Sequence, residues 1–260
     1  MNYLKTCFIK KNIIIRNIKI NYFVSPLLDK LEFIHAFFTK GSSNYNTGLL
    51  SDSLNGHNLN YSLNQVHSNN LVLCSNLQNQ NNYIGDGIIS DKPNQNLWVY
   101  TADCMPILFA DKKTRRVAAI HCGRLGLEKK IIKKTVGLFQ DLGSYKNQLI
   151  IAIGPSISKR NYFLDLKTIT KFQKNMTPQK KDNNTETDSL INKEEILDGF
   201  KSQGLISLDL QKSALHQIIE EEIPLDNIEI SNKCTYDSSS EFYSWRKTKT
   251  SKRQWSFISS

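Results

Sequence analysis

Three apolar runs in the middle of this 260-residue chain constrain its fold more than any other feature. They read "LWVYTADCMPILFAD" (97–111), "RRVAAIHCG" (115–123) and "NQLIIAIGPSI" (147–157). Apolar runs of this kind, rich in β-branched residues, are typical of buried strands. The chain therefore carries strands in its core.

Helical periodicity appears between and after these runs. In 126–143, leucine and isoleucine recur at helical spacing with lysines opposite, which predicts an amphipathic helix entered directly from a glycine turn. Further helices are predicted over 164–175 and 207–224, and short strands over 70–75 and 227–231.

Strands that alternate with helices predict an α/β (α+β) fold, with one mixed β-sheet core, helices packed on it, and a single domain. We place this domain at residues 29–260. Residues 1–28 alternate basic and apolar side chains, and we expect an N-terminal extension or an edge strand there. Residues 174–198 are polar, charged and almost free of aromatic side chains, which predicts a mobile surface insertion.

Composition narrows the class of protein. No apolar run approaches the ~20 residues that span a bilayer, so we expect no membrane partner. The five cysteines are odd in number and irregularly spaced, which favours a reducing, cytoplasmic location and leaves a thiolate free to bind a metal. The net charge of +10 suits anionic ligands, although most of the lysines are scattered over the sequence. Only residues 246–254, "RKTKTSKRQ", are dense enough to form a basic patch.

Three potential metal ligands stand where predicted strands begin or end. His67 precedes the strand at 70–75, Cys104 lies at the start of an apolar strand, and His121 ends another. One thiolate and two imidazoles suit Zn²⁺, and three protein ligands leave a fourth position open, as in catalytic zinc sites. Their separations match no local ligand motif, so spacing alone favours a packing role for each residue taken singly.

The turn after His121 is the second chemical signal. In "HCGRLG" (121–126) a strand ends, glycines follow and a helix begins, and the free N–H groups of a helix N-terminus attract anions. The alternative is an ordinary connection between a strand and a helix.

Several short motifs, taken in order from about Phe37 to the C-terminus, resemble the YfiH family, once described as laccase-domain or polyphenol oxidase proteins and now as zinc-dependent purine nucleoside phosphorylases. Each motif is modest alone, and their shared order and spacing make the resemblance specific. They are "DSLN" (52–55), "QVH" (65–67), "GDG" (85–87), "TADCMPILFAD" (101–111), "VAAIHCG" (117–123), "AIGPSI" (152–157), "DL" (209–210) and "CTYDSSSEFYSWRK" (234–247).

The resemblance implies that His67, Cys104 and His121 bind the metal, the same residues that strand-end chemistry proposes. It further implies phosphorolysis of inosine, guanosine, adenosine and methylthioadenosine to free base and ribose 1-phosphate, with adenosine deamination as a second activity. The implied partners are purine nucleosides and inorganic phosphate, and we expect a monomer or a homodimer.

Other residues are candidates for substrate and phosphate binding or for proton transfer. We expect Lys40, Asn55, Arg124 and Arg246 to bind substrate or phosphate. Asp103 and Asp86 are candidate proton carriers, and for both the alternative is a carboxylate that caps a loop or orients a histidine.

The sequence departs from the family pattern at two of these places. The family's HAGWRG stands here as "HCGRLG", with an arginine at the tryptophan position and a leucine at the arginine position. Lys40 stands for an arginine and lacks its bidentate fork. These departures bear on substrate affinity and leave the three metal ligands in place.

Three rival functions remain open. Copper-dependent phenol oxidation needs many histidines, and the chain has five in all. The basic cluster at 246–254, with Trp245 and Trp255 beside it, would suit single-stranded nucleic acid, although aromatic side chains that close the core are the preferred interpretation. A degenerate member that binds nucleosides without turnover is the third.

Overall fold

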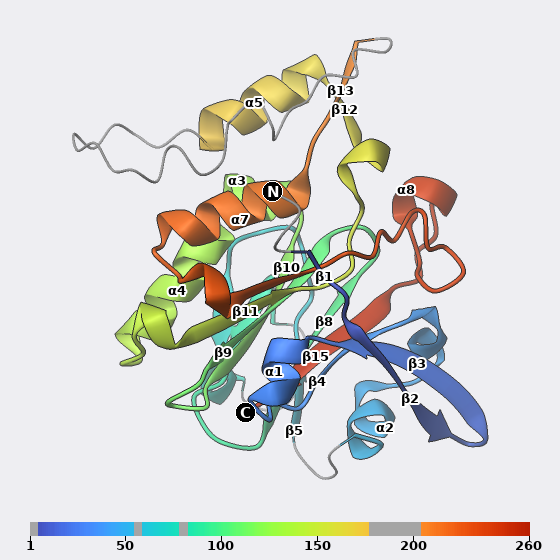
Figure 1. Ribbon diagram of the computed structural model, residues 1–260, viewed down its shortest axis with the longest axis vertical. Helices are drawn as coiled ribbons and strands as arrows, with labels where there is room; N and C mark the ends of the chain where they lie inside the picture. The colour runs from blue at the N-terminus through green and yellow to red at the C-terminus, as the bar shows by residue number, and fades with distance from the viewer. Residues whose placement is uncertain (1–4, 55–58, 78–82, 177–203) are drawn as a thin grey trace.

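Two mixed β-sheets lie face to face, and helices cover the outer face of the larger one in the computed structural model (Figure 1). The structure describes residues 5–54, 59–77, 83–176 and 204–260. The predicted α/β (α+β) class, with a mixed-sheet core in a single domain, is confirmed, but the prediction of one sheet was wrong.

The larger sheet has seven strands and is mixed. Its inner neighbours β11, β9, β10 and β7 run antiparallel to one another, and parallel pairs form its two edges. In spatial order the strands are β1 (Lys5–Thr6), β14 (Ile228–Ser231), β11 (Leu149–Ile153), β9 (Met105–Asp111), β10 (Val117–Cys122), β7 (Gly87–Ile89) and β6 (Leu71–Leu73).

The smaller sheet has six strands; four of its five neighbouring pairs are antiparallel, and the pair of β5 and β8 is parallel. β12 (Phe163–Asp165) and β13 (Leu205–Ser207) form a separate two-stranded ribbon. The six-stranded sheet includes the N-terminal hairpin of β2 and β3, and β2 forms one of its edges. In spatial order its strands are β2 (Ile9–Ile15), β3 (Ile18–Val24), β4 (His35–Phe38), β15 (Gln254–Ser259), β8 (Gln95–Thr101) and β5 (Leu59–Ser62).

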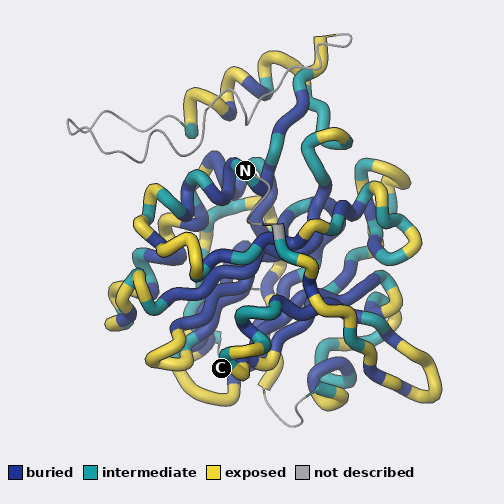
Figure 2. The backbone as a smooth tube through the Cα atoms, viewed as in Figure 1, coloured by how far each residue is buried: buried dark blue, intermediate teal, exposed yellow. Residues whose placement is uncertain are grey.

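The apolar runs are uninterrupted because both faces of the larger sheet are covered. Along β9, Ile107 and Phe109 pack toward the helices, whereas Leu108 and Ala110 pack toward the second sheet. All seven residues of β9 are buried, and Figure 2 shows the same burial along the neighbouring strands.

The run at 97–111 contains two strands that belong to different sheets. β8 ends at Thr101 in the six-stranded sheet and β9 begins at Met105 in the seven-stranded one. The three residues between them carry the chain across, and Asp103 adopts a left-handed φ of 90° there. Asp103 and Cys104 therefore lie where the two sheets meet.

Helices α3 (Arg124–Glu128), α4 (Ile131–Asp141) and α7 (Leu210–Glu220) bury their apolar sides against the seven-stranded sheet. The single helix predicted over 126–143 is two helices, because Lys130 between them is left-handed with φ 58°. Helix α5 (Leu166–Met176) follows β12 and lies above this layer (Figure 1).

Short helices complete the described chain. They are α1 (Pro26–Lys30), α2 (Thr47–Asp52) and α8 (Trp245–Thr248). Most of the insertion expected at 174–198 lies outside the described residues, since the description stops at Met176 and resumes at Gly204. Among the described residues, no helix is long and apolar enough to span a membrane.

Candidate metal centre and its pocket

His67, Cys104 and His121 converge on one point, although they come from three separate segments of the chain. Their ligand atoms all lie within 4.8 Å of one another. The Cys104 Sγ is 3.8 Å from the His67 Nε2, and the two imidazole rings are 4.7 Å apart between centroids, nearly perpendicular. Ligands of a tetrahedral ion with bonds of about 2.0–2.3 Å are spaced comparably, so these three side chains could hold a metal ion.

Asp86 holds two of these side chains, His67 and His121, in place through hydrogen bonds. Its carboxylate accepts hydrogen bonds from the backbone N–H groups of Val66, His67 and Ser68, from the Ser68 hydroxyl, and from the His121 Nδ1 at 2.8 Å. Burial raises the pKa of Asp86, but these hydrogen bonds and the charge of His121 outweigh burial and hold it well below its usual range. Because an ionised carboxylate only accepts, His121 must donate from Nδ1, which leaves Nε2 free to face Cys104.

Cys104 and His121 form a thiolate–imidazolium pair in the metal-free protein. Burial raises the pKa of the Cys104 thiol, but the positive His121 and hydrogen bonds from both histidines bring it to about 6. Burial likewise lowers the pKa of His121, whereas the Cys104 thiolate and Asp86 raise it to about 9. The thiolate that a metal needs is therefore already present at neutral pH.

Backbone geometry at the centre leaves little freedom. His67 has φ 57° and Asp103 has φ 90°, and both values lie in the left-handed region that side chains rarely adopt. A Cβ at Gly123 would come within 2.6 Å of the Cys104 sulfur, so only glycine lets the turn after β10 pass this close. Strained residues that cluster at one point are typical of functional sites.

Asp103 connects the sheet crossing to the C-terminal segment. Its carboxylate accepts hydrogen bonds from the Thr235 hydroxyl at 2.7 Å and from the Arg246 backbone N–H at 2.6 Å. Arg246 is the second residue of helix α8, so Asp103 fixes the start of that helix beside Cys104.

A hollow of about 450 Å³ opens over the three ligands. Three arginines line it, Arg124, Arg246 and Arg253. Polar and aromatic side chains complete its walls, among them Gln65, Tyr100, Thr101, Asp103, Tyr162 and Trp245. Cationic donors beside a metal centre suit an anionic ligand such as phosphate.

The arginines are held by neighbouring groups. Arg124 forms a close ion pair with the buried Glu128 one helical turn later, and its charge acts on the nearby Tyr162 side chain, lowering a pKa that burial raises. The Arg246 guanidinium lies 4.9 Å from the Tyr162 ring centre and donates to the Phe163 carbonyl at the base of the β12–β13 ribbon. Figure 1 shows α8 beside this ribbon.

Lys40 and Asn55 are the other two residues predicted to bind substrate or phosphate. The Lys40 Nζ donates to the Ser239 carbonyl, and Lys40 is not among the residues that line the hollow. Asn55 lies outside the described residues. Sequence reasoning did not single out Tyr162 or Glu128, because their places depend on contacts with Arg124 that are made only in the folded chain.

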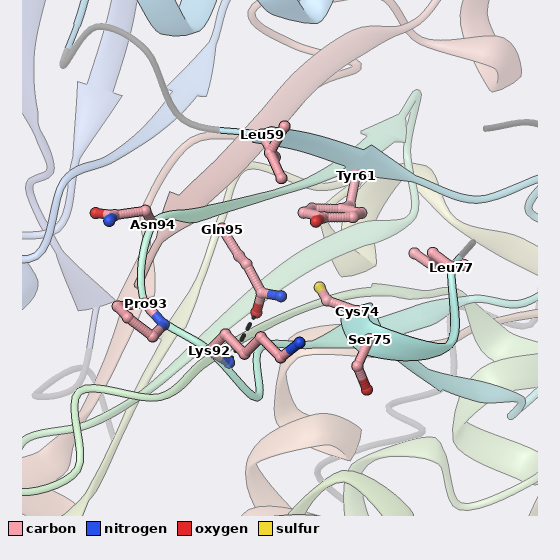
Figure 3. A pocket seen from close by; sticks show the side chains of 9 residues that line it. All are labelled: Leu59, Tyr61, Cys74, Ser75, Leu77, Lys92, Pro93, Asn94 and Gln95. Atoms are coloured by element: carbon pink, nitrogen blue, oxygen red, sulfur yellow. Dashed lines mark hydrogen bonds between the residues drawn. The ribbon is translucent and has the colours of Figure 1, made fainter. Parts of the chain in front are cut away.

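A second hollow, of about 370 Å³, lies at the far end of β8 (Figure 3). The Cys74 thiol lines it together with Tyr61 and Gln95. Burial first, and then the nearby Asp91 charge, raise the pKa of that thiol to well above neutrality, so it stays protonated and unreactive. The reactive groups are gathered in the hollow over Cys104 instead.

Comparisons with known proteins agree with the motifs. A family model described as multi-copper polyphenol oxidoreductase laccase matches residues 42–260. A protein of Synechocystis sp. named purine nucleoside phosphorylase slr1573 is 33% identical over 66% of this chain and 67% of its own length. One of Clostridium acetobutylicum, named purine nucleoside phosphorylase CA_C1699, is 30% identical over 83% of this chain and 82% of its own length.

Solved structures share the fold. The hypothetical protein YfiH of Bacillus licheniformis superposes with a TM-score of 0.74 at 20% identity, covering 92% of this chain and 96% of that one. Protein NMB0706 of Neisseria meningitidis, assigned to family DUF152, gives 0.68 at 18% identity, with 96% and 98% covered. The resemblance read from the motifs is confirmed, and the chain belongs to the YfiH family.

Proposed function

We propose that this protein is a zinc-dependent purine nucleoside phosphorylase. The observation that carries the proposal is a three-ligand cluster of one thiolate and two imidazoles that opens into an arginine-lined hollow. Relatives that are 30% or more identical carry the name purine nucleoside phosphorylase, which supplies the substrate class.

The reaction transfers the ribosyl group from the base to phosphate. A phosphate oxygen bonds to C1′, the bond from C1′ to the purine nitrogen breaks, and the base leaves with a proton. Arg246 and Arg253 hold the phosphate, while Arg124, paired with Glu128, adds positive charge at the same wall. A bound Zn²⁺ would supply a Lewis acid that polarises a substrate atom in the hollow.

The two carboxylates serve as positioning groups in this proposal. Asp86 receives five hydrogen bonds and holds His121 and the loop of His67. Asp103 receives two and holds α8. Because these oxygens already have partners, we assign orientation rather than proton transfer to both residues.

Adenosine deamination is proposed as a second reaction of the same centre. The ligand cluster favours it, because three protein ligands leave a position at which water can be activated toward C6 of the base. Ammonia release from adenosine in the absence of phosphate would test it, and a rate that is unaffected by the loss of Cys104 would exclude this centre.

The description of the family model names a different chemistry, copper-dependent oxidation, which needs many histidine ligands. Among the residues that the structure describes, few histidines outside the cluster are free to act as further ligands. Both ring nitrogens of His35 are occupied, one by the Ser25 N–H and one by the Phe33 carbonyl, and His216 pairs with Glu220 on α7. A thiolate with two imidazoles would also accept copper. Metal analysis with anaerobic assays separates the two, because phenol oxidation requires oxygen whereas phosphorolysis does not.

A role in binding nucleic acid through residues 246–254 has less support. Lys247 donates to the Tyr236 carbonyl and the Ser239 hydroxyl, and Lys249 lies 3.7 Å above the Trp245 ring centre. These two lysines of the basic cluster are therefore engaged by neighbouring groups of the protein.

A product assay tests the proposed function. Purified protein is given inosine with and without phosphate, before and after treatment with a chelator. We expect hypoxanthine and ribose 1-phosphate only when both phosphate and metal are present. Cys104→Ala should abolish turnover, whereas Cys7→Ala, which removes an exposed cysteine, should not. Free ribose formed without phosphate would contradict a phosphorylase.

A further inference from the structure

Trp245 presents an indole ring to the hollow over the metal centre. Trp98 is 1% exposed and Trp255 is partly buried, whereas Trp245 is 45% exposed and lines the hollow. The Lys249 ammonium lies 3.7 Å from the ring centre and covers one face of the indole. Lys249 is not among the residues that line the hollow, so we assign the opposite face of the indole to a flat ligand.

The position of this ring is fixed relative to Cys104. The Ser244 hydroxyl caps α8 by accepting the Lys247 N–H, and the Asp103 carboxylate accepts the Arg246 N–H. Asp103 directly precedes Cys104, so the indole and the metal ligand share one support. A platform held in this way stacks a base without first having to be ordered.

Thr101 brings a buried hydroxyl without a partner in the described part of the chain to the wall of the same hollow. Its residue is 2% exposed, and among the described residues its hydroxyl has no hydrogen-bond partner. Thr101 lines the hollow at the end of β8, three residues before Cys104. Buried hydroxyls are normally paired, so a hydroxyl of this kind in a pocket wall is suited to a ligand atom.

We propose that Trp245 and Thr101 form the nucleoside subsite, in which the indole stacks on the purine and the Thr101 hydroxyl hydrogen-bonds the nucleoside. The identity of the ligand rests on the proposed function. Arg246 and Arg253 line the same hollow, and each donates through Nη1 to a backbone carbonyl, so the remaining N–H groups of each guanidinium are assigned to phosphate. Stacking on an indole favours the two-ring purines over pyrimidines, because the larger base overlaps more of the ring.

Substitutions at Trp245 test the stacking. We expect Trp245→Ala to raise the KM for inosine about ten-fold or more, with the KM for phosphate unchanged, and Trp245→Phe to recover much of this loss. Inosine should quench the tryptophan fluorescence of the wild-type protein, and this quenching should disappear in Trp245→Phe while the other two tryptophans remain. An unchanged KM for inosine in Trp245→Ala would overturn the stacking role.

Substitutions at Thr101 test the hydroxyl. Thr101→Val keeps the shape of the side chain and should raise the KM for inosine about ten-fold without lowering the melting temperature, whereas Thr101→Ser should stay close to the wild type. If Thr101→Val changes only the melting temperature, the hydroxyl has a structural role and the assignment fails.

The proposed reaction and the proposed nucleoside subsite can be refuted independently of each other. If inosine quenches Trp245 but no phosphorolysis occurs, the proposed reaction is wrong and the subsite stands. If phosphorolysis occurs with unchanged KM values in both Trp245→Ala and Thr101→Val, the subsite is wrong and the reaction stands.

Discussion

At the scale of single residues, Asp86 determines more of the site than any of the three ligands. It is 1% exposed, it fixes the His121 tautomer, and it holds the strained loop that carries His67. A side chain with this many partners cannot be replaced by its amide without turning an acceptor into a donor that faces N–H groups.

We therefore predict that Asp86→Asn weakens zinc affinity by about 10–100-fold. Competition with a chromogenic chelator measures this loss. Asp141→Asn, an exposed aspartate at the end of α4, serves as the control and should leave affinity unchanged. Equal zinc affinities in the two variants would refute the role of Asp86.

The thiolate–imidazolium pair predicts how metal binding depends on pH. A bound metal needs a neutral His121, whose pKa of about 9 keeps it protonated at pH 7, and a Cys104 thiolate, which forms above a pKa of about 6. Metal binding should therefore release about one proton near pH 8, from His121, and none above pH 9. Calorimetry in buffers of different ionisation enthalpy counts the protons released, and no release at pH 8 would contradict the pair.

The sequence singled out the three candidate ligands and, as one of two alternatives, the orienting carboxylates Asp86 and Asp103, but it did not single out Glu128 or Tyr162. Strand ends and family motifs both pointed to His67, Cys104 and His121, which the fold brings together. Glu128 and Tyr162 carry no such signal. Glu128 looks like one more charge in an amphipathic helix, and Tyr162 precedes a ribbon whose contact with Arg246 joins distant parts of the chain.

At the scale of elements, the break between α3 and α4 shows where periodicity is insufficient. Apolar spacing continues through 126–143, so the pattern predicts one helix, yet Lys130 is left-handed. A lysine in the sequence gives no signal of a left-handed backbone conformation. The break lets α3 begin directly after Gly123, beside the metal centre, while α4 packs along the sheet.

From the break between α3 and α4 we predict opposite changes in stability when two nearby lysines are replaced by glycine. Lys130→Gly should stabilise the protein by ~1 kcal/mol, because glycine adopts a positive φ without the penalty that lysine carries. Lys134→Gly, at an exposed position inside α4, should destabilise it by a similar amount. Urea unfolding measures both, and destabilisation by Lys130→Gly would mean that the left-handed turn is not present.

At the scale of the whole molecule, the candidate metal centre joins segments that the two sheets and the helical layer bring together. His67 lies in a loop before β6, Cys104 at the crossing between sheets, and His121 at the end of β10. The sequence predicted the alternation of strands and helices but not a second sheet, because residues 97–111 read as one apolar run. Asp103 in the middle of that run marks the crossing.

Because the ligands come from separate segments, metal binding should stabilise the whole fold. Zinc at a hundred times its Kd contributes about 2.7 kcal/mol, so a chelator should lower the melting temperature of the wild-type protein. Cys104→Ala should show no such dependence. A wild-type protein that melts at the same temperature with and without chelator would contradict this coupling.

The most direct test of the central claim is the metal content of purified protein, measured by elemental analysis after exhaustive dialysis. We expect about one zinc ion per chain in the wild type and almost none in Cys104→Ala. Equal zinc content in the two proteins, or a metal-free wild type with full phosphorolytic activity, would contradict it.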